Sequence, residues 1–133
     1  MRKHIETIVV NGVAIAILCL LLAIAGTWLR MTTQFDLGEK AFGKGDFIGA
    51  VAGYEAALHM YIPNHPAMEK AARQLWILGE TSERQGDINR ALIAYRALRS
   101  SFYAVKWLAT PGREWISRCD EKIAELTPLQ ITQ

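Results

Sequence analysis

The chain has 133 residues, a formal net charge of +2 and a composition in which 51% of the residues are hydrophobic. This length fits one small domain with an appendage, and so small a net charge argues against a protein that binds nucleic acid. The two cysteines, Cys19 and Cys119, lie far apart without CxxC spacing, which argues against a disulfide framework, a zinc site or a redox motif.

The first predicted element is a membrane-spanning helix over residues 8–29. These 22 residues carry no charge, and at about 1.5 Å per residue they reach roughly 33 Å, enough for a bilayer core of about 30 Å. A cleaved signal peptide is the alternative, because Ala23-Ile24-Ala25 is an acceptable cleavage site. The apolar stretch exceeds the roughly 7 to 15 residues of a signal-peptide core, however, which favours an uncleaved anchor within residues 1–30.

The basic residues around the anchor indicate its orientation. Arg2 and Lys3 precede it, whereas Arg30 stands nearly alone directly after it. The positive-inside rule then favours a cytoplasmic N-terminus and a periplasmic domain in a bacterial inner membrane. Lys40 and Lys44 also lie near the far end, so the charges favour this topology without fixing it.

Small residues recur along one side of the predicted span at steps of three and four. They are Gly12, Ala16, Cys19, Ala23 and Gly26. Such a stripe lets another helix backbone approach closely in lipid, so we expect transmembrane packing against an integral membrane partner. A plain anchor is the alternative, since alanine and glycine are common in any spanning helix.

Helical patterns fill the rest of the chain. The span is expected to continue without a linker into a first helix that ends near Gly43 or Gly45, because no proline interrupts this stretch. Apolar residues at spacings of three and four then predict helices over residues 47–60 and 66–85, the latter opened by Pro66.

The turn after the first of these helices and the turn after the helix over 66–85 have a repeated sequence. Gly45-Asp46 and Gly86-Asp87 are each followed by an apolar residue, then Ala and then Tyr in the same register, which predicts two helical hairpins over about 34–60 and 66–101. The residues that carry the pattern are Leu37, Gly38, Phe47, Ala50, Tyr54, Ala57 and Leu58 in one copy and Leu78, Gly79, Ala91, Tyr95 and Leu98 in the other.

This pattern resembles the tetratricopeptide repeat (TPR) family, whose motif pairs Leu-Gly in one helix with Gly-Asp and an aromatic residue at the turn. The resemblance implies stacked helical hairpins and a domain that binds proteins or peptides. The two copies are offset by 41 residues rather than by the 34 residues of that family. A regular concave groove is therefore not implied.

Two stacked hairpins leave an apolar surface at the end of the stack, which a further element must cover. Thr110-Pro111 offers a helix start, and apolar residues follow at helical spacing, which predicts a capping helix over about 111–126. The expected fold is therefore all-α: a transmembrane helix, a TPR-like domain over 31–127 with its capping helix, and a loose tail over 128–133.

The candidate partner-binding residues combine aromatic rings with basic side chains, a composition typical of interface hot spots. They are Tyr103, Trp107, Arg96, Arg99 and Lys106. Packing of the rings, together with Phe102 and Trp115, between the second hairpin and the capping helix is the alternative for the aromatic residues. For the basic residues, contact with anionic lipid headgroups and a plain solvated helix face are the alternatives.

Chemistry-bearing motifs are missing from the sequence. His59, His65 and Glu69 have no recognised metal-ligand spacing, and no nucleophile motif or phosphate-binding loop occurs. We therefore expect no catalytic residue, no metal and no cofactor.

The sequence thus predicts a single-pass, membrane-anchored interaction or assembly subunit of a larger membrane protein complex. An integral membrane subunit would pack on the span, and a protein partner would bind the domain. The alternative is a membrane-anchored receptor or chaperone-like module that binds extended client peptides in translocation or envelope biogenesis. This alternative would require an open groove lined by polar side chains.

Overall fold

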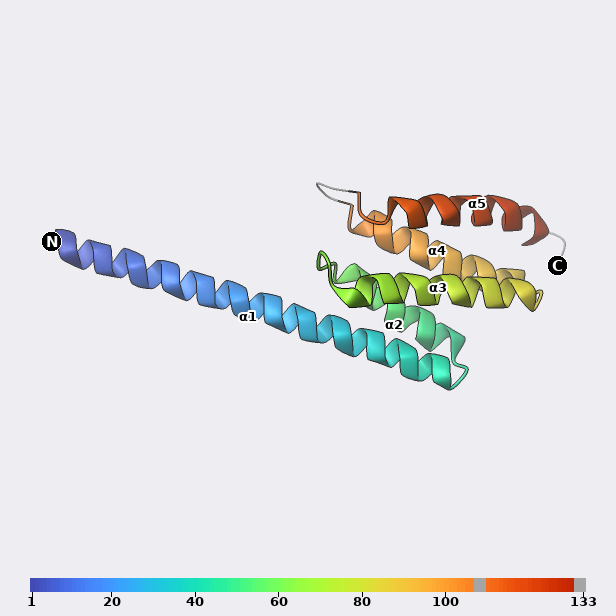
Figure 1. Ribbon diagram of the computed structural model, residues 1–133, viewed down its shortest axis with the longest axis horizontal. Coiled ribbons are helices and arrows are strands. Elements are labelled where there is room, and N and C mark those ends of the chain that lie inside the picture. Colours follow the sequence, from blue (N-terminus) through green and yellow to red (C-terminus); the bar gives the residue numbers. More distant parts are fainter. Residues whose placement is uncertain (107–109, 131–133) are drawn as a thin grey trace.

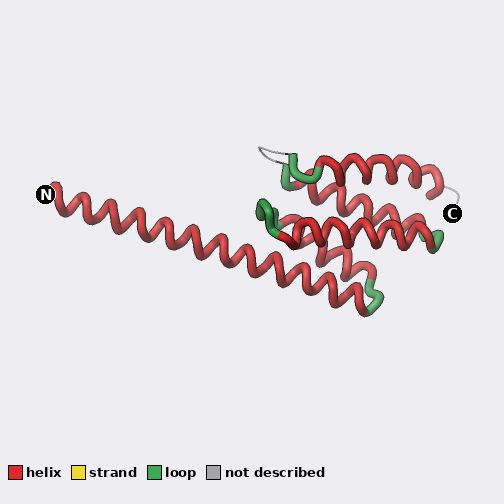
Figure 2. Tube along the Cα trace, viewed as in Figure 1, coloured by secondary structure: helices red, strands yellow, loops and turns green. Residues whose placement is uncertain are grey.

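The computed structural model describes residues 1–106 and 110–130, and these residues fold into helices and connections without any strand (Figures 1 and 2). The expected all-α class is confirmed. The helices are α1 (Arg2–Gly43), α2 (Phe47–His59), α3 (Pro66–Arg84), α4 (Ile88–Ala104) and α5 (Arg113–Gln130).

Helix α1 is one continuous helix of 42 residues, about 63 Å long at 1.5 Å per residue. Its first part, residues 2–22, projects from the domain as an arm, whereas its second part packs along α2 (Figure 1). Met31 and Gly38 are the buried residues of the helix. The prediction that the apolar segment continues into the domain without a linker is confirmed.

The domain has two layers. Helices α1, α3 and α5 form one layer, and α2 and α4 lie behind them in the second (Figure 1). Helix α2 contacts α1, α3 and α4, while α4 also contacts α3 and α5. The second part of α1 and helices α2 to α5 therefore bury their apolar sides against neighbouring helices, which is how helical hairpins stack.

The two repeated turns adopt the same geometry. Gly45 and Gly86 have φ values of 73° and 75°, a region in which only glycine is unstrained. Asp46 and Asp87 cap the helices that follow, because each side chain accepts a hydrogen bond of 3.0 Å from the backbone N–H three residues later. The internal repeat seen in the sequence is thus a repeat of structure.

Glycine also permits close helix packing inside the first hairpin. A Cβ atom on Gly53 would lie 2.5 Å from the Cα of Gly38 on the facing helix, and the ring of Tyr54 covers Gly38. The hydroxyl of Tyr54 donates to Glu39 Oε1 at 2.6 Å. The backbones of α1 and α2 therefore approach more closely than larger side chains would allow.

The second hairpin repeats this arrangement with a different acceptor. The ring of Tyr95 covers Gly79, and its hydroxyl donates to Glu83 Oε2 at 3.0 Å. Both tyrosines are fully buried, and each hydroxyl donates its hydrogen bond to a carboxylate. Burial and the neighbouring carboxylates raise the pKa of both phenols.

Helix α5 closes the stack and is longer at its C-terminal end than expected. It runs to Gln130 with Pro128 inside it, so residues 128–130 are its last turn rather than part of a loose tail. Leu126 is buried against α4, and the Gln130 side chain donates to Asn89 Oδ1 at 2.8 Å. These contacts hold the helix past the proline. Residues 131–133 of the expected tail lie outside the described residues.

Candidate interaction site

The connection between α2 and α3, residues 60–65, lies against α1 near the arm. We call this connection the α2–α3 loop. The rings of Trp28 and His65 have centroids 3.9 Å apart. His65 is 5% exposed, and its Nδ1 accepts the backbone N–H of Ala67 at 3.0 Å, which caps α3. Burial lowers the pKa of His65, so the side chain is a neutral cap.

The same loop encloses a hollow of about 390 Å³ against α1. The hollow is lined by Ala23, Ile24 and Thr27 on α1 and by Tyr61, Ile62 and Pro63 on the loop. The last turns of the apolar segment are therefore neighbours of the domain. Ala23, one of the five residues of the predicted packing stripe, belongs to this junction.

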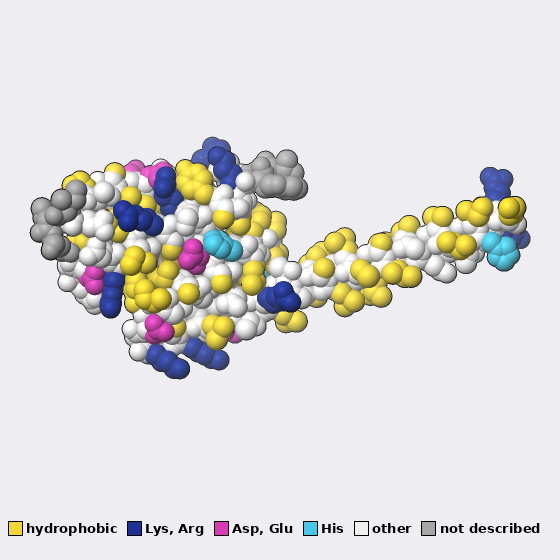
Figure 3. All heavy atoms as spheres, turned by 180° about the vertical axis from the view of Figure 1, so that it is seen from behind, with side chains coloured by type: hydrophobic (Ala, Val, Ile, Leu, Met, Phe, Trp, Pro, Cys, Tyr) yellow, Lys and Arg dark blue, Asp and Glu magenta, His cyan; other side chains and the backbone are white. Residues whose placement is uncertain are grey.

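The other end of the packing stripe is open. Gly12, Ala16 and Cys19 are exposed, and nothing lies within 4 Å of the position of a Cβ atom on Gly12. The same holds for Gly26 at the junction end of the stripe. At 3.6 residues per turn the stripe lies roughly 100° around the helix axis from the buried Met31. Figure 3 shows the arm covered with hydrophobic side chains, with basic ones at its N-terminal tip. A second helix can therefore reach the stripe beside the domain.

The predicted aromatic and basic patch is partly assembled at the end of α4. Tyr103 is 44% exposed, with Arg99 Cζ 5.1 Å and Lys106 Nζ 5.9 Å from the centre of its ring. Arg96 is exposed one turn earlier on the same helix face. Trp107 lies outside the described residues. Arg96, Arg99, Tyr103 and Lys106 are called the α4 patch below.

One charge of the α4 patch is already used inside the domain. Arg99 forms an ion pair with Asp120 of α5, so it joins the second hairpin to the closing helix. Among the described residues of the patch, Arg96 and Lys106 are the cations that form no ion pair with a carboxylate. Phe102, one residue before Tyr103, is buried in the core.

Two hollows lined by charged side chains lie between α3 and α5, and together they are called the groove between α3 and α5. At one end Trp76 and Trp115 have ring centroids 6.0 Å apart, and Trp115 Nε1 donates to Glu69 Oε2 at 3.3 Å. At the other end Lys122 Nζ lies 3.0 Å from both carboxylate oxygens of Glu83. The two ends enclose hollows of about 370 Å³ and 400 Å³. Sequence reasoning did not find this groove, because its contacts join residues far apart in the chain.

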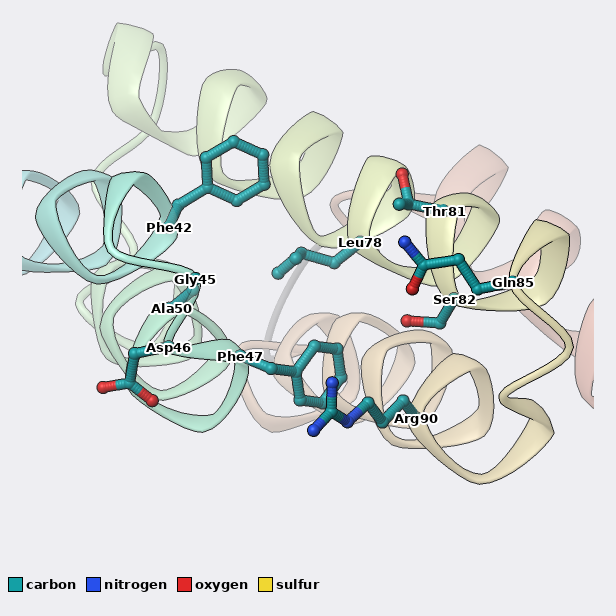
Figure 4. A pocket seen from close by; sticks show the side chains of 10 residues that line it. All are labelled: Phe42, Gly45, Asp46, Phe47, Ala50, Leu78, Thr81, Ser82, Gln85 and Arg90. Carbon is teal, nitrogen blue, oxygen red and sulfur yellow. The ribbon is translucent and has the colours of Figure 1, made fainter.

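A further hollow of about 240 Å³ lies between the two hairpins, beside the glycine turns (Figure 4). Phe42 and Leu78 point into it from α1 and α3, and Thr81, Ser82 and Gln85 form its polar side (Figure 4). Arg90 lies over the ring of Phe47 at 5.3 Å. The hollow therefore combines apolar side chains with polar ones, and Asp46 and Arg90 are the charged residues that line it.

Metal-binding and nucleophilic groups do not converge in the part of the chain that the structure describes. No three side chains of His, Cys, Asp or Glu are placed to hold a metal ion there. Cys119 is fully buried, and burial, with a smaller effect of Asp120, raises the pKa of its thiol to about 12. This thiol is therefore protonated and shielded at neutral pH.

No known protein family, no curated protein and no solved structure matches the chain.

Proposed function

We propose that the chain is a single-pass membrane protein whose helical domain is a non-catalytic interaction or assembly subunit of a larger membrane complex. The observation that carries this proposal is the dual role of α1. The helix is long and apolar enough to cross a membrane, and its second part belongs to the core of the domain through Met31 and Gly38. A domain built on its own anchor has a fixed position beside the bilayer.

Two surfaces support a role in assembly. The part of the packing stripe that lies away from the domain, at Gly12, Ala16 and Cys19, allows a spanning helix of a partner to pack closely. The α4 patch offers an exposed ring flanked by cations to a partner protein, or to anionic lipid headgroups. The repeated hairpins fit a TPR-like domain, and that resemblance supports protein binding at the level of fold only.

Substitution within the stripe tests the proposal. Ala16→Leu places a bulky side chain on the stripe, whereas Ala14→Leu adds the same bulk on nearly the opposite side of the helix. We expect Ala16→Leu to reduce co-purification of a stoichiometric membrane partner from mild detergent by at least several-fold, and Ala14→Leu to leave it unchanged. Equal recovery with both variants would remove the stripe from the proposal.

A client-peptide receptor is the second candidate, and the groove between α3 and α5 is the observation that favours it. Trp76 and Trp115 offer apolar contacts there, with charged side chains of both signs along the groove. Its charges are largely paired with one another, as in Glu83 with Lys122. If the chain is a receptor, co-purification from mild detergent should yield a mixture of weakly held unfolded proteins. If it is an assembly subunit, the same experiment should yield one partner in constant ratio.

The proposed topology places the N-terminus in the cytoplasm and the domain in the periplasm of a bacterial inner membrane. Cys119 cannot report it, because its thiol is buried. In a Cys19→Ser background, Ser117→Cys on the exposed side of α5 provides an accessible thiol. We expect a membrane-impermeant maleimide to label this residue from the periplasmic side. Labelling only after the cytoplasm is opened would reverse the orientation.

A further inference from the structure

We propose that the α2–α3 loop inserts into the interfacial layer, between headgroups and acyl chains, of the bilayer that α1 spans. The loop would then be a second membrane contact of the domain. This inference rests on the proposed spanning role of α1. It names a lipid surface, at the boundary between headgroups and acyl chains, as the occupant of the exposed apolar side of the loop.

The register of the loop against α1 carries the inference. A hydrocarbon core of about 30 Å takes about 20 helical residues, so a core that begins at Ile8 ends near Thr27. Ala23 then lies about 6 Å inside that boundary, at 1.5 Å per residue. Because the loop lines one hollow with Ala23, Ile24 and Thr27, Tyr61 and Pro63 lie in the zone between the boundary and about 6 Å inside it.

The chemistry of the loop suits this depth. Residues 60–64 carry no charged side chain. Tyr61 is 36% exposed and combines an apolar ring with a polar hydroxyl, a residue type enriched at membrane interfaces. Pro63 has no N–H group, and the N–H of His65 donates to the Ile62 carbonyl at 3.1 Å. Fewer unpaired donors remain to be solvated than in an ordinary loop.

The loop also packs against α1 at the level of the headgroups. His65 packs on Trp28 while capping α3, and a buried neutral imidazole is compatible with a low-dielectric setting. The glycine turns, which carry Lys44, Asp46, Arg84 and Asp87, lie at the opposite end of the domain (Figure 1). The polar turns therefore point away from the bilayer, and the uncharged loop points toward it. Amphipathic helices at an interface bury their apolar face about 5–10 Å into the headgroup and acyl boundary, a depth comparable with that of the loop.

Depth-dependent quenching in vesicles of phosphatidylcholine tests the inference with the full chain. An environment-sensitive fluorophore is attached to one thiol at a time: native Cys19 in the middle of the span, Pro63→Cys in the loop, or Gln85→Cys at the far turn. The last two carry Cys19→Ser, and the buried Cys119 is left unlabelled. Tyr61→Cys provides a second loop position should Pro63→Cys disturb folding, which circular dichroism reports.

We expect a lipid nitroxide near the headgroup to quench the loop label several-fold more than the label at residue 85. Aqueous iodide should show the reverse order. A nitroxide near the end of the acyl chain should quench the label on Cys19 most strongly. Loop labels at both positions that respond like residue 85, with Cys19 still quenched by lipid, would overturn the interfacial loop alone. Loss of lipid quenching at Cys19 would overturn both the spanning role and the loop inference.

Discussion

The indole of Trp28 lies against the imidazole of His65 with ring centroids 3.9 Å apart. Trp28 belongs to the last turn of the apolar segment, and His65 is the residue before the first turn of α3. This contact joins the apolar part of α1 to the start of the second hairpin without passing through the first hairpin. It fixes the α2–α3 loop beside α1.

The Trp28–His65 contact should be measurable as a coupling energy. His65→Asn retains an oxygen that can cap α3 but removes the ring, and Trp28→Ala removes the other ring. A double-mutant cycle on denaturant unfolding in detergent should give a coupling of about 0.5–1.5 kcal/mol, the usual range for aromatic pairs. Effects that add within about 0.3 kcal/mol would show that the ring contact contributes nothing.

His65 should also make stability depend on acid. Burial lowers its pKa in the folded protein below the ordinary value of 6.5. The unfolded chain therefore binds a proton first as the pH falls, so the stabilising contribution is present above about pH 6.5 and is lost below it. The melting temperature should fall between pH 7 and 5, and His65→Asn should flatten this part of the curve. An unchanged pH profile in that variant would show that His65 is not the cause of the loss of stability in acid.

The close approach of α1 and α2 predicts a severe effect of a single methyl group. Gly53→Ala would put a Cβ atom 2.5 Å from the backbone of Gly38, and relief requires the helices to move apart. We expect a loss of about 1–3 kcal/mol in the free energy of unfolding, as for other overpacked cores. Gly43→Ala is the matched control, since nothing lies within 4 Å of its added Cβ. Equal stability of the two variants would show that the helices are not in contact at Gly53.

Alkaline pH should destabilise the domain through Cys119. Burial raises the pKa of its thiol from an ordinary value near 9 to about 12. The unfolded chain loses this proton first as the pH rises, so the contribution is complete below pH 9 and is lost between about pH 9 and 12. Cys119→Ala should delay the fall in melting temperature until about pH 10, where the phenols of unfolded tyrosines begin to ionise. A fall that begins at the same pH in both proteins would exclude the thiol as its cause.

The two equivalent helix caps should contribute equally. Asp46→Ala and Asp87→Ala each remove a 3.0 Å hydrogen bond to the start of a helix, and each should cost about 1 kcal/mol. Asp87→Ala also removes an exposed ion pair with Arg90 at 3.4 Å, so the two variants are compared at high salt, which screens that pair. The double variant should lose the sum, because the caps lie in different hairpins and share no partner. Asp36→Ala, an exposed position on α1, serves as the control. A clearly unequal pair would show that the two turns are not equivalent in energy.

Local signals in the sequence were enough to predict the helices. Gly45-Asp46, Gly86-Asp87 and Pro66 mark helix boundaries through the conformation of one or two residues, and the structure has helix boundaries at each of them. The predicted loose tail over 128–133 is wrong at residues 128–130, where the helix continues through Pro128. A proline ends a helix when only local forces act, whereas here the burial of Leu126 and the bond from Gln130 to Asn89 continue it.

The contacts between distant segments could not be predicted in this way. The pairs Trp28 with His65, Trp76 with Trp115 and Glu83 with Lys122 each join different helices or a helix and a loop. Periodicity identifies the side of a helix that is buried but not the residue that meets it. The α4 patch was found because its members share one short segment, and the groove between α3 and α5 was missed because its members do not.

The continuity of α1 has a consequence for proteolysis. A protease that cuts just after Arg30 would leave Met31 and Gly38 on the released fragment without the helix turns that precede them. The Trp28–His65 contact would be lost at the same time. Cleavage at this point would therefore free a weakened fragment rather than an intact domain, and the turnover of the apolar arm and of the domain would be coupled.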